Sequence, residues 1–186
     1  MRSSHNFEDA LSQLLSSIGE DPARPGLRDT PLRVKEWYEE FFWGVAKDPV
    51  EHLAHGFQEQ HSDPVLLRDI PFFSMCEHHL LPFFGFANLA YIPNGWIAGN
   101  SRLVAALETL AHRPQLQERL TRQTAETLIK GLAADGAAVI LRAEHLCMTM
   151  KGTQRPKTVM VTVATRGNFQ NGRVSRNDLL ELTRKG

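Results

Sequence analysis

Two stretches decide the fold class, GAAVILRAEHLCMTM at residues 136–150 and KTVMVTVATRGNF at residues 157–169. Both contain short apolar segments with β-branched residues, which favours strands. In the second stretch, valines at every other position from 159 to 163 alternate with other residues. This alternation is typical of an antiparallel strand with one buried face. The sequence therefore predicts an antiparallel sheet.

Three further strands are expected upstream, and two helices lie between the groups of strands. The expected strands are VLLRDIPFF at 65–73, FGFANLAYIP at 84–93 and GWIAG at 95–99. Ser101 is the expected N-cap of a first helix, and Pro114 opens a second, longer one, because these residues are favoured where helices begin. This order predicts an α+β fold with helices on one face of the sheet.

The N-terminal part is expected to be helical. Apolar residues recur at helical spacing after Asn6, which is the expected N-cap, and Gly19 ends this helix. Thr30 is the expected N-cap of a second helix, with Pro31 at its first position.

The division into domains follows from these elements. Residues 47–64 are polar without a regular pattern and are expected to form a long connection, and Ser175 is the expected cap of a last helix. We therefore expect an N-terminal helical extension over residues 1–64 and a sheet-bearing domain over residues 65–186.

The composition excludes several classes of protein. The 186 residues carry 21 basic and 21 acidic side chains, so the formal net charge is zero, which argues against broad electrostatic binding of nucleic acid. No apolar run approaches the ~20 residues that span a bilayer, and the N-terminus has no signal-peptide core. We therefore expect no membrane partner and a cytoplasmic location.

Both cysteines of the chain stand beside histidines. Cys76 lies in the hexapeptide SMCEHH, and Cys147 lies in EHLC. Cys76 and His79, three residues apart on a turn, can reach one ion. In a strand, residues two apart point to the same face, so His145 and Cys147 are expected to face one space.

Two cysteines and one histidine make a three-ligand set for zinc, which in catalytic sites leaves the fourth position to water. Such a water ionises near neutral pH and becomes a nucleophile. His78 and His145 then remain for proton transfer. The alternatives are two buried thiols, a polar surface loop at CEHH and a hydrogen-bonded core histidine at position 145.

The segment HRPQLQERLT at residues 112–121 places polar side chains beside an apolar stripe. If Leu116 and Leu120 face inward, Gln117 and Glu118 lie to either side. One interpretation is a solvated helix face. The other is an acidic group that accepts two hydrogen bonds from an amidine-like edge such as guanine N1–H and N2–H₂.

Four segments together resemble the GTP cyclohydrolase I family: GEDPARPGLRDTPLRV, SMCEHHLLPFFG, HRPQLQERLT and EHLCMTMKG, in this order. The resemblance covers roughly residues 7–184. It implies a tunnelling fold (T-fold) with an antiparallel sheet and paired helices, preceded by N-terminal helices. It also implies a toroidal homo-oligomer, a decamer of two stacked pentamers, with active sites between subunits.

The resemblance implies hydrolytic opening of the guanine imidazole ring of GTP, release of C8 as formate and formation of 7,8-dihydroneopterin triphosphate. The implied zinc ligands are Cys76, His79 and Cys147, and a zinc-activated water attacks C8. His145 is implied to protonate the imidazole nitrogen or to steady the phosphate side, and His78 to assist proton transfer. The product would serve pterin, folate or deazapurine synthesis.

The resemblance also implies residues that hold the substrate. Glu118, helped by Gln117, anchors the guanine edge, and Ser101 falls where the family has a serine near the ribose and phosphates. The candidate cations for the phosphates are three residues: Arg33, Arg102 and Lys151.

The chain departs from the family pattern at the phosphate end. Asn100 and Ala105 stand where the family usually has leucine and arginine, and Lys151 replaces an arginine and so loses the bidentate fork. These changes leave open a diverged paralog that acts on a different or less phosphorylated guanine nucleotide. A non-catalytic zinc-binding or ligand-binding T-fold protein is the third hypothesis.

Overall fold

The computed structural model of the chain describes residues 6–54, 56–150 and 158–170. The chain divides into two compact units, residues 1–43 and 44–186, which are described separately. The last helix expected after Ser175 lies outside the described residues. No helix in the described ranges is long and apolar enough to cross a membrane.

The first unit is a pair of helices, α1 (Phe7–Ser17) and α2 (Thr30–Phe41). The Asn6 cap is confirmed, because its side chain accepts a hydrogen bond from the backbone N–H of Glu8. The second cap is wrong by one residue. Asp29 occupies the N-cap position, and Thr30 already belongs to the helix. An ion pair between Lys35 and Glu8, at 3.4 Å, joins the two helices.

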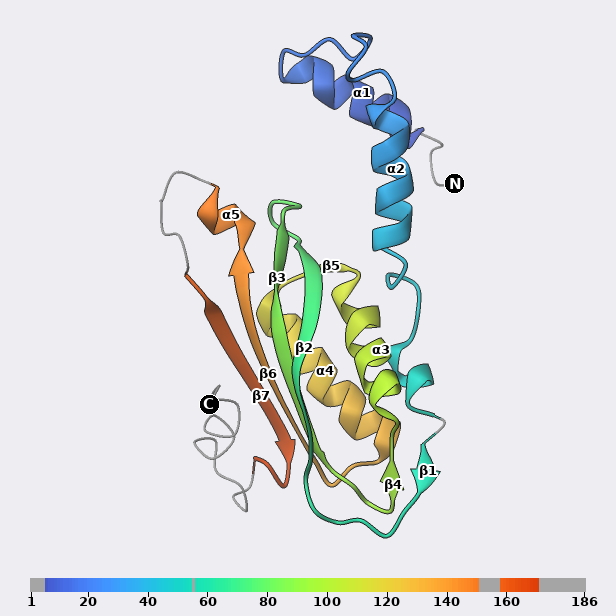
Figure 1. The fold of residues 1–186 in the computed structure, drawn as a ribbon, viewed down its shortest axis with the longest axis vertical. Coiled ribbons are helices and arrows are strands. Elements are labelled where there is room, and N and C mark those ends of the chain that lie inside the picture. Colours follow the sequence, from blue (N-terminus) through green and yellow to red (C-terminus); the bar gives the residue numbers. More distant parts are fainter. Residues whose placement is uncertain (1–5, 55, 151–157, 171–186) are drawn as a thin grey trace. The chain divides into compact units, whose positions relative to one another are not determined.

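The second unit is built on a five-stranded sheet in the order β5-β2-β3-β6-β7 (Figure 1). Its strands are β2 (Val65–Cys76), β3 (Pro82–Ile92), β5 (Pro114–Gln115), β6 (Gly136–His145) and β7 (Met160–Gly167). All neighbours are antiparallel except the short β5, which runs parallel to β2. The mixed α+β class and the antiparallel sheet are confirmed.

Two helices, α3 (Asn100–Ala111) and α4 (Gln117–Leu132), cover one face of this sheet (Figure 1). The apolar residues of both helices meet those of β2, β3 and β6 in one core cluster, in which a fully buried leucine or phenylalanine stabilises the fold by roughly 1.5–3 kcal/mol. Fully buried members include Phe83, Leu89, Leu107, Leu120 and Leu141.

Two expected helix starts are wrong. Gly99, not Ser101, is the N-cap of α3, and no side chain caps this helix. Pro114 does not open α4, because Pro114 and Gln115 form β5 and the helix begins at Gln117. A proline, which has no N–H, is tolerated both in the first turn of a helix and on the edge of a sheet. Pairing of Met75 and Cys76 with this segment selects the strand.

The expected strand over residues 136–150 is also shorter than predicted. β6 ends at His145, and the chain turns into the short helix α5 (Leu146–Thr149). Cys147 therefore lies on a helical turn, and the argument that it shares a strand face with His145 is wrong. The other expected strands are found at similar positions, with β4 reduced to Trp96–Ile97.

The connection at residues 47–64 is partly ordered structure. A short helix η1 (Pro49–His52) contacts α3 and α4, and β1 (Phe57–Gln58) pairs with β4. Gly44 approaches the backbone of α3 so closely that a Cβ atom would lie 2.2 Å from the Thr109 carbonyl oxygen. The domain boundary expected at residue 64 thus lies further along the chain than the division between the two compact units.

The sheet has two ends that matter for function. At the Cys76 end, defined by Cys76 and His145, β2 and β6 finish. At the Tyr91 end, Tyr91 pairs with Val65 and with Ala137. About eight residues of β3 separate Phe83, opposite His145, from Tyr91, which is roughly 26 Å of strand. α3 begins near the Tyr91 end and finishes at the Cys76 end (Figure 1).

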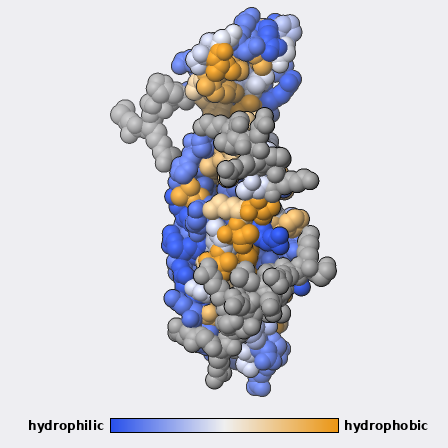
Figure 2. Space-filling model, turned by 90° about the vertical axis from the view of Figure 1, so that its left-hand side faces the viewer, coloured by the Kyte–Doolittle hydropathy of each residue, from blue (hydrophilic) through white to orange (hydrophobic). Residues whose placement is uncertain are grey.

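The sheet face opposite the helices is partly exposed. Phe73, Phe86 and Val161 are 59%, 44% and 50% exposed on β2, β3 and β7. A smaller cluster of buried residues gathers around Ile140 and Phe169. Figure 2 shows apolar surface in the middle of one side of the molecule.

Candidate metal centre and active site

Three metal-binding side chains converge at the Cys76 end. The ligand atoms of Cys76, His79 and Cys147 all lie within 4.8 Å of one another, and the Cys76 Sγ is 4.0 Å from the His79 Nδ1. They come from the end of β2, from the turn after it and from α5. Two thiols and one imidazole are the soft donor set that suits zinc. The three predicted ligands are therefore brought together.

The turn that carries two of these ligands is fixed by its backbone. The N–H of Cys76 donates to the Leu81 carbonyl at 2.9 Å, and the N–H of Leu80 donates to the Cys76 carbonyl at 2.8 Å. Leu80 has a positive φ of 49°, which closes this tight connection between β2 and β3. The N–H of Glu77 donates to the Gln115 carbonyl at 3.0 Å, so the turn is also bound to β5.

Glu77, between the two ligands, does not face the metal group. Its carboxylate accepts two hydrogen bonds from the Arg119 guanidinium on α4, one of them at 2.9 Å. The bond to Arg119 holds the pKa of the Glu77 carboxyl below its usual value. This forked pair links the ligand turn to the first turn of α4.

The two thiols influence each other. The pKa of the Cys147 thiol is raised, first by burial and then by the neighbouring Cys76. Two adjacent thiolates repel each other, and a divalent cation between them removes that repulsion and favours ionisation. The electrostatics of the pair therefore match a cation-binding site.

His145, the last residue of β6, is held from two sides. Its ring stacks on Phe83 with centroids 4.7 Å apart and an interplanar angle of 2°. Its Nε2 lies 2.8 Å from the Oε1 of Gln117. Burial lowers the pKa of His145, and the nearby Glu118 acts against this shift. The ring is thus held in a fixed position, two residues before the possible ligand Cys147.

The first turn of α4 sends its polar side chains in three directions. Gln117 is 1% exposed and points to the sheet, Arg119 reaches Glu77, and Glu118 is exposed. Glu118 lines a cavity together with Thr162 and Arg166 of β7. A carboxylate in this position is free to accept hydrogen bonds from a ligand. The expected role of Gln117 at the guanine edge stays a prediction.

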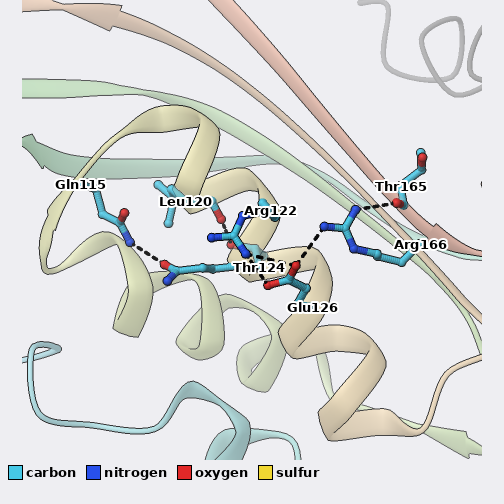
Figure 3. A network of polar contacts seen from close by, with 8 residues as sticks. Gln115, Leu120, Arg122, Thr124, Glu126, Thr165 and Arg166 are labelled. Carbon is cyan, nitrogen blue, oxygen red and sulfur yellow. Dashed lines mark hydrogen bonds and ion pairs between the residues drawn. The ribbon is translucent and has the colours of Figure 1, made fainter.

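Other contacts fix α4 along its length (Figure 3). Gln115 donates to the Gln123 side chain at 3.0 Å. Further along, Glu126 accepts hydrogen bonds from Arg122 and from Arg166 of β7, both at 2.9 Å. The helix that carries Glu118 is therefore bound to both the preceding segment and the edge strand.

The expected phosphate-binding residues are not at the Cys76 end. Ser101 and Arg102 lie in the first turn of α3, about ten residues or roughly 15 Å of helix before Ala111, whose carbonyl accepts from Ser74 beside Cys76. The Arg102 guanidinium donates to the His52 carbonyl at 3.3 Å. Of the two remaining expected cations, Arg33 belongs to the first compact unit, which is described separately, and Lys151 lies outside the described residues.

His78 is exposed on the ligand turn, with its ring centroid 6.2 Å from that of His79. It is therefore available to solvent or substrate. Sequence reasoning missed Phe83 and the Glu77–Arg119 pair. Nothing in the sequence of an apolar strand shows which phenylalanine will stack on a histidine. Glu77 and Arg119 stand 42 residues apart, so no short spacing in the sequence pairs them.

Comparison with known proteins identifies the chain. Residues 7–184 match the family GTP cyclohydrolase I. The chain belongs to this family. The resemblance of the four sequence segments is thus confirmed.

Relatives in the GTP cyclohydrolase I family are similar over nearly their whole length. GTP cyclohydrolase 1 of Halalkalibacterium halodurans is 51% identical over 177 residues, which cover 95% of this chain and 94% of that protein. The Streptococcus agalactiae (serotype Ia) protein of the same name is 46% identical over the full length of both chains. That of Carboxydothermus hydrogenoformans is 49% identical, over 95% of this chain and 92% of the relative.

Among solved structures, the apo form of the archaeosine synthase QueF-Like aligns with 56% of this chain and 94% of its own. The TM-score is 0.42 and the sequence identity is 16%. A likeness at this level supports no further conclusion.

Proposed function

We propose that the chain is a zinc-dependent GTP cyclohydrolase I that opens the guanine imidazole ring of GTP by hydrolysis. Formate is released, and the product is 7,8-dihydroneopterin triphosphate. The observation that carries the proposal is the cluster of Cys76, His79 and Cys147 beside the positioned ring of His145, in a chain of this family. A cytoplasmic location is part of the proposal.

Cys76, His79 and Cys147 would hold the zinc ion, with the two sulfurs as thiolates. When bound, zinc supplies a Lewis acid that lowers the pKa of water into the neutral range and so provides the nucleophile for C8 of guanine. Three protein ligands are the number found in catalytic zinc sites, which keep one position open.

The chain's own residues supply binding and proton transfer. The exposed carboxylate of Glu118 would accept hydrogen bonds from guanine N1–H and N2–H₂. The neutral ring of His145 would exchange a proton with the imidazole nitrogen of the opening ring. His78, exposed on the ligand turn, would assist proton transfer during C8 release.

The active site would be formed between subunits. The metal group lies at the Cys76 end, whereas Ser101 and Arg102 lie near the Tyr91 end of the same sheet. One nucleotide could touch both sets if the Tyr91 end of a second copy lies against the Cys76 end of the first. The proposed assembly is the T-fold ring of the family, a homodecamer. In it, Arg33 and Lys151 would add further cations around the triphosphate.

The test is formate release and pterin formation from GTP by metal-analysed protein. GTP, GDP, GMP and guanosine are supplied in parallel, and formate and oxidised pterin fluorescence are measured. Formate and pterin from GTP support the proposal. No formate from any guanine compound, with zinc present, would reject it.

A second candidate is a paralog that prefers a less phosphorylated guanine nucleotide. The observation that favours it is the composition of the α3 start, where Asn100 and Ala105 carry no charge and Arg102 is bonded to the His52 carbonyl. A higher kcat/KM with GDP or GMP than with GTP would favour this candidate. A preference for GTP would remove it.

A further inference from the structure

Gln117 is a buried glutamine whose amide orientation is determined by its neighbours. Its Nε2 lies 3.2 Å from the Leu141 carbonyl oxygen, 3.1 Å from that of Met160 and 3.1 Å from the Thr162 Oγ1. A backbone carbonyl only accepts hydrogen bonds, so the end of the amide that faces two of them must be the NH₂ group. The Oε1 then points the other way.

The orientation of the amide decides where the proton of His145 resides. The Gln117 Oε1 lies 2.8 Å from the His145 Nε2. An amide oxygen has no hydrogen to give, so the Nε2 of His145 must be the donor. In the neutral ring, the Nδ1 of His145 then carries the lone pair. Within the described part of the chain, no residue hydrogen-bonds to this Nδ1.

Two threonines complete the network with a single consistent set of hydrogens. The Thr121 hydroxyl donates to the backbone carbonyl oxygen of Gln117 at 2.6 Å. The Thr162 hydroxyl, 2.6 Å from the Thr121 Oγ1, therefore donates to Thr121 and keeps its lone pairs for the Gln117 NH₂. A flipped amide would face oxygen lone pairs at three contacts, which strongly disfavours it.

The ring of His145 has little freedom left. Stacking on the fully buried Phe83 sets the plane of the ring, and the bond to Gln117 sets its rotation within that plane. We propose that Gln117 is a positioning residue, which holds His145 as the Nε2–H tautomer so that Nδ1 exchanges the proton with the substrate. The part that concerns substrate rests on the proposed GTP cyclohydrolase activity.

This inference and the expected guanine-anchoring role of Gln117 predict different kinetics. Loss of a positioning residue lowers kcat, whereas loss of a substrate anchor raises KM. In Gln117→Met, we expect kcat to fall roughly 10-fold to 100-fold, a part of the 10² to 10⁴ that acid–base catalysis contributes, with KM for GTP within about 2-fold. Zinc content and the melting temperature identify any variant that has not folded.

The matched control is Gln115→Met. Gln115 is also 1% exposed and stands two residues away, but its amide bonds to the Leu110 carbonyl and to Gln123 instead of a histidine. We expect kcat of this variant within about 3-fold of the parent chain, which is the scale of a small packing change. Equal losses of kcat in both variants would overturn the proposal, as would an unchanged kcat with raised KM in Gln117→Met.

A spectroscopic test reads the tautomer without any turnover. The protein is labelled with ¹⁵N at its histidine rings, and the His145→Gln variant assigns the signal of His145. We expect a protonated Nε2 and an unprotonated Nδ1 in the zinc-loaded chain, and exchange between both tautomers in Gln117→Met. A protonated Nδ1 in the parent chain overturns the inference even if the chain turns over GTP.

A milder variant covers the case that Gln117→Met does not fold. Thr162→Val removes one acceptor of the amide and keeps the shape of the side chain. We expect a smaller loss of kcat, roughly 3-fold to 10-fold, with partial exchange of the His145 tautomer. Unchanged tautomer and unchanged kcat in Thr162→Val would contradict the network. If the zinc-loaded parent chain does not act on GTP, the activity proposal fails, and the tautomer is still decided by the spectra.

Discussion

The Cys76 end and the Tyr91 end of the sheet differ in how completely one chain builds them. At the Cys76 end, three ligands, a fixed histidine and a forked ion pair converge from five elements. At the Tyr91 end, a cavity beside Asn100 is lined by apolar and polar residues with Glu59 as its charged group, in the described residues. Within the described residues, one chain thus brings the possible metal ligands and His145 together at the Cys76 end, whereas no lysine or arginine lines the cavity at the Tyr91 end.

This difference shows why the charge balance of the whole chain says little about its ligand. A polyanion needs several cations close together, whatever the net charge is. Arg102, near the Tyr91 end, already donates to a backbone carbonyl. The convergence of cations would then arise by assembly, when the Tyr91 end of one copy meets the Cys76 end of another. The predictions below test each end separately and then both together.

The largest effect is expected from the metal ligands. Cys147→Ser removes one of two thiolates, and because a three-ligand zinc site has no spare protein ligand, we expect the zinc content to fall and activity to drop by more than about 10³-fold. Metal analysis and formate release on the same samples measure both.

The contrasting variant is His78→Ala, on the same turn but outside the ligand group. We expect turnover to fall by roughly 10² to 10⁴, with zinc content unchanged, because a proton-transfer group is lost and no ligand is. Loss of zinc in His78→Ala would show that the ligand set is misassigned.

The second prediction joins the two ends. We expect Cys147→Ser and Ser101→Ala each to be inactive or weak, because they damage different ends of the sheet. If each site takes its ends from two copies, oligomers formed from an equal mixture contain roughly a quarter of intact sites. We therefore expect co-expressed variants to regain about that share of the parent activity per site.

Two controls make this mixing experiment decisive. Cys147→Ser mixed with Cys76→Ser damages the same end twice, so no recovery is expected. Purified Cys147→Ser and Ser101→Ala, mixed under conditions that prevent subunit exchange, should also show no recovery of activity. Absence of recovery in the co-expressed pair, with mixed oligomers shown by mass, would mean that both ends of a site belong to one chain.

The third prediction concerns the link between the ligand turn and α4. Arg119→Met removes the forked partner of Glu77, and we expect zinc to be lost to a chelator about 10-fold faster, because supports around ligands affect metal affinity on that scale. Arg122→Met is the control, since Arg122 sits on the same helix and pairs with Glu126 at the surface. Equal zinc loss in both variants would mean that the Glu77–Arg119 pair has no special role.

The sequence predicted the parts of this molecule that depend on residue type and short spacing. Cys76, His79 and Cys147 were found because thiols and imidazoles are rare and have few other uses together. The α+β class followed from alternation in the strands. Pro114 misled because its preference for helix starts is weaker than the pairing of Pro114 and Gln115 with β2. Ser101 misled because α3 begins one residue earlier, after Gly99.

What sequence could not provide are the partners of polar side chains. Gln117 and His145 stand 28 residues apart, and the same glutamine could equally have faced a ligand. The direction of its amide follows only from the two carbonyls of β6 and β7 that surround it. Likewise, the placement of Ser101 near the Tyr91 end needs the course of α3 across the sheet.

The smallest effect is expected between the two ends. Glu126 bonds to Arg166 and Arg122, and these bonds lower the pKa of the Glu126 carboxyl (Figure 3). A lowered folded-state pKa stabilises the fold above the unfolded value of 4.5, and this contribution is lost as pH falls through the folded value. Because the carboxylate is 44% exposed, solvent screening limits it to roughly 0.2–1 kcal/mol.

Glu126→Gln should therefore lower the free energy of unfolding slightly at pH 7, and the difference from the parent chain should vanish at an acidic pH below the lowered folded pKa, where both side chains are neutral. Denaturant titrations of both chains at the two pH values measure this. Zinc content and kcat should stay the same, because Glu126 contacts neither end. A kcat change in Glu126→Gln would show that α4 transmits strain to the Cys76 end, and that the two ends are less independent than their contacts indicate.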